Sequence, residues 1–147
     1  MRTAASFTLL AALALGFAPA PVPKKVPTSE AHLKAMQGKW RRVSLSIDGK
    51  PYPEAPGGVF VTIKSDLMAF ASPHDTWRVT LDPAKKPGRL DTRRADGGGD
   101  PFWGVYRLDG DALTVCCRRG AKESDRPASF DPGQPGVWVQ VFRRVKE

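Results

Sequence analysis

The sequence predicts an all-β domain: an antiparallel up-and-down barrel of about eight strands, preceded by a short helical turn. Short apolar runs rich in β-branched and aromatic residues alternate with turn residues along the chain. Gly and Pro number 14 each among 147 residues, which favours many turns over long helices. Apart from the N-terminal apolar stretch, no segment reads as the long helix that a parallel crossover needs, and closure into a barrel protects the edges of an antiparallel meander.

The first part of the chain has the form of an export signal. Arg2 gives a positive start, and Thr3–Val22 then carries no charge. Its central apolar segment, Ala4–Phe17, has the length of the hydrophobic region of a signal peptide. It is shorter than the roughly 20 apolar residues of a membrane span. We therefore expect a cleavable signal peptide at residues 1–20 and a periplasmic or extracellular mature protein without a membrane span. An uncleaved N-terminal anchor is the alternative.

A proline-rich linker and a short helix precede the strands. Residues 21–28 are expected to be extended and solvated, and residues 29–147 to form the domain. Ser29 can cap a helix, Glu30 suits the positive end of that helix, and Gly38 can stop it. We therefore expect one or two helical turns at the start of the domain.

The strands follow in order, and each is ended by turn residues. The strongest hairpin signal is Asp109-Gly110-Asp111, and a two-residue turn at Asp109-Gly110 would pair Tyr106 with Leu113. The pattern predicts seven or eight strands, at Trp40–Ile47, Val59–Ile63, Leu67–Phe70, Trp77–Leu81, Arg89–Thr92 (the least marked), Phe102–Leu108, Ala112–Cys117 and Val137–Val145.

That pairing separates the two faces of the hairpin, because successive side chains on a strand point to opposite sides. Trp103 and Cys116 are expected to face outward. An eight-stranded barrel has room inside for packed side chains or for one small ligand, so a filled core and a ligand cavity both stay open. The residues expected to face the interior, which are also the candidate ligand-binding residues, are Tyr106, Leu108, Leu113, Val115 and Cys117.

The cysteines and acidic residues predict no metal site and no cofactor. Cys116 and Cys117 are adjacent, so on a strand they point apart, which favours two free thiols over a strained vicinal disulfide or a zinc site. The acidic residues of the middle region lack the spacing of a calcium loop. The glycine-rich stretch at residues 96–100 lacks the Lys-Ser/Thr pair and the following helix of a phosphate-binding loop.

No catalytic constellation is visible, so we predict that the protein is not an enzyme. The two histidines are His32 and His74, and neither has a patterned nucleophile and orienting group beside it. The net charge is +8, yet the basic residues are scattered, with no run of five or more, which argues against nucleic-acid binding. A basic surface leaves an anionic component of the cell envelope as a candidate partner.

Short motifs along the domain resemble those of a known family. Gly38-Lys39-Trp40 resembles the glycine-any-tryptophan motif that opens the first strand of lipocalins, and Arg143-Arg144 resembles the basic residue that closes over that tryptophan. From about residue 36 to 145 the chain is more closely similar to uncharacterised, secreted, lipocalin-like domains abundant in planctomycete bacteria. Cys117 departs from their usual single cysteine. The matching pieces are Gln37-Gly38-Lys39-Trp40, Asp48-Gly49-Lys50, Leu81-Asp82-Pro83, Lys86-Pro87, Leu90-Asp91, Gly104-Val105-Tyr106, Leu108-Asp109-Gly110-Asp111, Leu113-Thr114-Val115-Cys116, Arg126-Pro127 with Phe130, and Phe142-Arg143-Arg144.

The resemblance implies a calycin-type barrel and no particular activity. It also implies how one end of the barrel is closed. Gly38 lets the chain enter the barrel, and Trp40 plugs the closed end. Arg143 or Arg144 can stack on the indole and bond nearby carbonyls. These residues are therefore expected to have a structural role.

The long connection before the last strand has two interpretations. It can fold as a lid over one barrel end, with Arg126 reaching a carboxylate or a ligand and Phe130 beside it. Alternatively, a salt bridge from Arg126 fixes the connection in place.

Together these features predict an exported binding module for a small, partly apolar molecule. The alternative is a filled barrel that acts as a non-catalytic interaction domain at the cell envelope through its basic surface. An open apolar cavity with converging polar groups would favour the first function, and a packed interior with a clustered basic face would favour the second.

Overall fold

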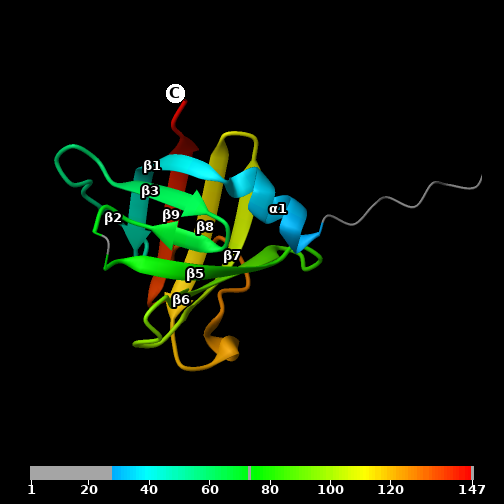
Figure 1. Cartoon of the computed structure of the whole chain (residues 1–147). Coiled ribbons are helices and arrows are strands. Elements are labelled where there is room, and N and C mark those ends of the chain that lie inside the picture. The colour runs from blue at the N-terminus through cyan, green and yellow to red at the C-terminus, as the bar shows by residue number, and fades with distance from the viewer. Residues whose placement is uncertain (1–27, 73, 147) are drawn as a thin grey trace, which may run out of the picture.

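The short strands close an antiparallel barrel, which confirms the predicted fold class. The computed structural model describes residues 28–72 and 74–146 (Figure 1). The predicted signal peptide and linker, apart from Thr28, lie outside the described residues. Each strand pairs with its neighbour in the order β1-β3-β4-β5-β6-β7-β8-β9, and β9 pairs back onto β1 to close the ring. The elements are α1 (Ser29–Met36), β1 (Gly38–Ile47), β2 (Lys50–Tyr52), β3 (Phe60–Lys64), β4 (Leu67–Ala69), β5 (Thr76–Asp82), β6 (Gly88–Arg94), β7 (Phe102–Asp109), β8 (Ala112–Arg119), the 3-10 turn η1 (Glu123–Asp125) and β9 (Val137–Arg144).

A ninth strand, β2, was not predicted. Asp48 and Gly49 form the turn with φ of 53° and 74°, and two residues with positive φ are what a tight hairpin turn requires. Lys50 directly follows this turn and already pairs with Ile47. β2 lies beside the second half of β1 and adds an edge outside the ring.

The β7–β8 hairpin differs from its expected register by two residues. Leu108 pairs with Leu113, so the turn residues are Gly110 and Asp111 rather than Asp109 and Gly110. Gly110 has φ 55°, and a glycine at the first turn position suits the type II′ hairpin turn. A shift of two residues leaves every side chain on its expected face, because only an odd shift exchanges the faces.

The helix α1 covers one end of the barrel. The Thr28 side chain accepts a hydrogen bond from the backbone N–H of Ala31 and caps the helix, one residue before the expected cap at Ser29. Ser29 instead donates its hydroxyl to the backbone oxygen of Leu81 at the end of β5. Met36, on the inner side of α1, is fully buried in the barrel core.

Trp40 and Arg144 close this end. Trp40 is 0% exposed and its indole N–H donates to the Met36 oxygen at 2.8 Å. The guanidinium of Arg144 lies 4.2 Å from the centre of the indole and donates to the backbone oxygens of Ala35 and Gln37 at 2.6 Å. Gly38 enters β1 with φ 113°, a conformation that favours glycine.

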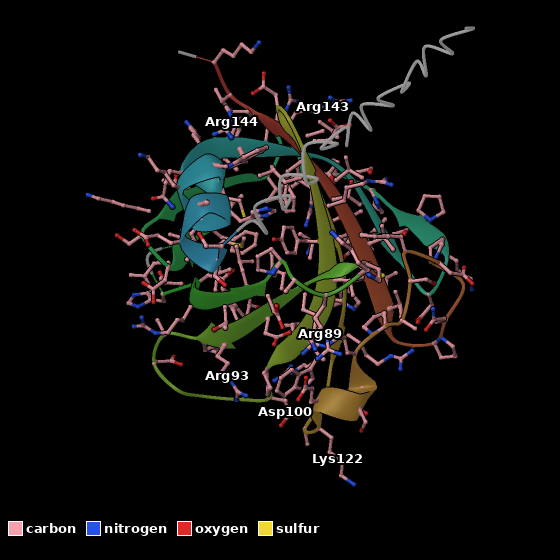
Figure 2. The ribbon with its side chains drawn as sticks, turned by 90° about the vertical axis from the view of Figure 1, so that its right-hand side faces the viewer. Arg89, Arg93, Asp100, Lys122, Arg143 and Arg144 are labelled. Atoms are coloured by element: carbon pink, nitrogen blue, oxygen red, sulfur yellow. The ribbon has the colours of Figure 1, made fainter. Side chains whose placement is uncertain are left out.

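Arg143 does not share this role. It is the neighbour of Arg144 on β9, so it points to the outer face, where it pairs in register with Arg41 on β1. Both arginines lie at the end of the barrel that α1 covers (Figure 2). Only Arg144 faces the tryptophan.

Candidate functional site

The barrel end opposite α1 contains a cavity of about 560 Å³. That volume lies within the range of about 300–1,000 Å³ typical of small-molecule sites. Its walls come from the middle of β1, from one end of β5, β6, β7, β8 and β9, and from the connection after β4. We call this end the mouth.

Aromatic side chains form much of the cavity wall. The Phe102 ring on β7 lies 5.5 Å from the Trp77 ring on β5 and 5.6 Å from the Trp138 ring on β9, both in edge-to-face contact. Phe70, after β4, also lines the cavity. Phe70, Phe102 and Trp138 are partly buried and pack on the barrel core, so the wall is continuous with the core. Such a wall suits an apolar ring or chain.

Three arginines and one aspartate also line the cavity. Arg42 on β1 bonds Glu54 at 3.1 Å and the Gln140 amide oxygen at 3.3 Å. Asp75 accepts the indole N–H of Trp77 at 2.6 Å.

The second arginine, Arg94 on β6, is also neutralised. It forms an ion pair with Asp96 at 2.8 Å and donates to the backbone oxygen of His74 at 3.2 Å. The hydrogen bond from Arg94 lowers the pKa of Asp96 to about 2, so this pair stays ionised at any ordinary pH.

The third arginine, Arg119 at the end of β8, differs from the other two. It is exposed, and within residues 28–72 and 74–146 no carboxylate or hydrogen-bond acceptor pairs with its guanidinium. One terminal nitrogen lies so close to Gly99 that a Cβ there would be 2.9 Å from it. The glycine-rich connection between β6 and β7 therefore packs against this side chain.

The candidate interior residues all lie inside the barrel, but only Cys117 lines the cavity. Tyr106, Leu113 and Val115 are buried near the α1 end, and Leu108 packs against them. They lie in the half of the barrel that the core fills. The Tyr106 hydroxyl lies 2.6 Å from Nδ1 of His32 on α1, and burial raises the pKa of Tyr106 to about 12.

Arg126 and Phe130 do not form a lid, and the alternative interpretation holds. Arg126 forms an ion pair with Asp91 on β6 and donates to the Gly104 oxygen at 2.8 Å. Phe130 packs outside the barrel, on a small cluster of Val105, Cys116 and Val137. The connection therefore covers the outer face of β6, β7 and β8, near Arg89 and Lys122 (Figure 2).

The two cysteines are free and lie on opposite sides of the barrel wall, as the alternation predicts. Cys117 faces the cavity. Cys116 lies beneath the outer connection and its thiol donates to the Ser129 oxygen at 3.3 Å. Burial raises the pKa of Cys116 to about 11 and that of Cys117 to about 12, so both are neutral thiols at pH 7.

We expect the fold to lose stability as the pH rises from 9 towards 12. The folded state keeps protons on Cys116, Cys117 and Tyr106 that the unfolded chain releases near its ordinary pKa values of 9.0 and 10.0. The stabilisation is complete below pH 9 and is lost as the pH passes through the raised values. Urea midpoints measured at pH 7, 9 and 11 test this. Cys117→Ala should show a smaller decline, and an identical decline would contradict the assignment to Cys117.

Sequence reasoning missed most of the cavity wall, although the signal was present. The alternation that placed Tyr106 and Cys117 inside also places Phe102 and Arg119 inside, because each lies an even number of residues away on the same strand.

In the described part of the chain, no group of three or more His, Cys, Asp or Glu side chains is arranged to hold a metal ion. No helix among those residues is long and apolar enough to cross a membrane.

Comparison of the chain with protein-family models, curated proteins and solved structures finds no match in any of the three. The fold and the cavity therefore carry the functional argument by themselves.

Proposed function

We propose that this protein is an exported, lipocalin-like barrel that binds a small, partly apolar molecule in the cavity at its mouth. The observation that carries the proposal is the cavity of about 560 Å³ with an aromatic wall and a charged rim. Concave apolar sites with a few polar groups are the usual form of small-molecule sites. The charge-free stretch after Arg2 supports export. The open cavity favours this function over a filled interaction barrel.

The cavity can shelter the apolar part of a bound molecule from water while one side stays open at the mouth. Phe102 and its two tryptophan neighbours form the wall, and Cys117 lies deeper on β8. Below Cys117 the barrel is filled by packed side chains such as Val115 and Leu113. A ligand therefore enters from the mouth and stops at this packed layer.

We expect the neutral fluorophore N-phenyl-1-naphthylamine to bind the mature protein purified from the exported fraction, with an increase in its fluorescence. Cys117→Phe places a ring in the cavity and should abolish the increase, whereas Cys117→Ala should keep it. Overpacking costs about 1–3 kcal/mol, so a thermal melt must first show that Cys117→Phe is folded. If that variant does not fold, Trp138→Ala replaces it in the test. Trp138→Ala should lower the affinity for the probe, because it removes part of the aromatic wall.

Two results would contradict the proposal. One is the absence of any fluorescence increase with the unaltered protein. The other is an increase of equal size and affinity in folded Cys117→Phe, which would place the probe elsewhere on the surface.

A further inference from the structure

We propose that the ligand of this cavity is an amphiphile with one negative charge, an apolar chain or ring that carries a single carboxylate, and that Arg119 binds the carboxylate. This inference rests on the proposed function and specifies its ligand class. It follows from the charge balance around the cavity and from the position of Arg119 relative to the apolar wall.

The charges of the other two arginines are already neutralised by the protein. Arg42 is held between Glu54 and Gln140 at 3.1 and 3.3 Å. Arg94 is held by Asp96 at 2.8 Å. A ligand that bound either of them would have to compete with a carboxylate already in place, so neither is the first choice for an anionic group.

Arg119 offers a positive charge without such competition. In the part of the chain that the structure describes, its guanidinium has no ion-pair or hydrogen-bond partner, yet it lines the cavity. A guanidinium presents a planar set of donors that matches a carboxylate in two parallel hydrogen bonds. The binding of one carboxylate would give Arg119 the kind of ion-pair partner that Arg42 and Arg94 already have.

The location of Arg119 at the mouth sets the orientation of the ligand. Arg119 and Cys117 lie on the same face of β8, and two residues of a strand span roughly 7 Å. Phe102 pairs in register with Arg119 across β7 and β8, and both residues line the cavity. A ligand whose carboxylate binds Arg119 therefore places its apolar part along Phe102 and towards Cys117.

Asp75 limits the charge of the ligand. Its carboxylate also lines the cavity and is held by the Trp77 indole at 2.6 Å. A second negative charge on the ligand would meet this carboxylate at the rim, where like charges repel. One unpaired arginine and one fixed aspartate favour a head group with a single negative charge.

The test is displacement of N-phenyl-1-naphthylamine from the mature protein by octanoate, octanol or octylammonium at pH 7.5 and low salt. We expect octanoate to displace the probe at about tenfold lower concentration than the other two, the size of one charge-assisted hydrogen bond. Arg119→Gln should remove this tenfold advantage of octanoate over octanol when both competitors are measured against the same variant. Arg143→Gln, which makes the same change in charge on the outer face at the α1 end, should retain it.

The outcomes separate the two proposals. Binding of the probe without a preference for octanoate, or a preference that survives in Arg119→Gln, overturns this inference and leaves the proposed function intact. Failure of the probe to bind overturns both. Added salt should reduce the octanoate advantage, because the ion pair lies at an exposed rim.

Discussion

Replacement of Trp40 by alanine is expected to lower the free energy of unfolding by about 3–5 kcal/mol, the range for deletion of a large buried aromatic side chain. Trp40 is 0% exposed and is the largest fully buried side chain in the described core. Its loss also leaves the Met36 oxygen without the indole donor and Arg144 without the ring on which it stacks. Urea unfolding followed by the fluorescence of the remaining tryptophans measures the change.

Trp40→Phe separates packing from hydrogen bonding at this position. It keeps an aromatic ring beneath Arg144 but removes the donor to Met36, and an unpaired buried acceptor costs about 1–3 kcal/mol. We therefore expect the free energy of unfolding of Trp40→Phe to lie between that of the wild type and that of Trp40→Ala. A loss for Trp40→Ala below about 1 kcal/mol, the scale of surface substitutions, would contradict the role of Trp40 as the plug of the closed end.

Arg126→Met is expected to cost about 3 kcal/mol, near the lower end of the range for breaking a buried ion pair. The Arg126 side chain is 9% exposed and Asp91 is 19% exposed, so the substitution leaves a largely buried carboxylate without its partner. It also removes the donor to the Gly104 oxygen. Urea unfolding of the single variant, and of the double variant Arg126→Met with Asp91→Asn, measures the effect. The double variant should recover part of the lost stability, because it leaves no buried charge without a partner.

Arg89→Met is the matched control for that experiment. Arg89 forms an ion pair with Glu123 in the same region, but the side chains are 38% and 59% exposed. Exposed pairs contribute about 0–1 kcal/mol. Equal losses in the free energy of unfolding for Arg89→Met and Arg126→Met would contradict the prediction that the buried Arg126–Asp91 pair contributes more stability than an exposed pair.

The sequence predicts the parts of this molecule that depend on local pattern. Alternation along β7 and β8 assigns Tyr106 and Cys117 to the interior and Cys116 to the outer face, even though the turn residue was misplaced by one position. The strand positions follow from turn residues such as Asp109-Gly110-Asp111. Both signals lie within a few residues of the feature they predict.

Features that depend on distant pairing could not be predicted in the same way. The contact of Arg126 with Asp91 joins residues 35 positions apart, so no local pattern places the connection on the outer face rather than over the mouth. Likewise, which half of the interior is filled depends on how α1 inserts Met36 into the α1 end, beside Trp40. The cavity is the half that remains, which explains why four of the five predicted ligand-binding residues fall in the packed half.

The contacts near the two ends of the described chain determine where another molecule can be joined to the protein. Ser29 at the start of the described chain bonds the end of β5, and Lys146 near the other terminus bonds Asp111 in the β7–β8 turn. Both attachment points therefore lie on the side away from the mouth. A fusion partner or an affinity tag joined directly before Thr28 or directly after Lys146 would therefore be attached on the side of the barrel away from the opening.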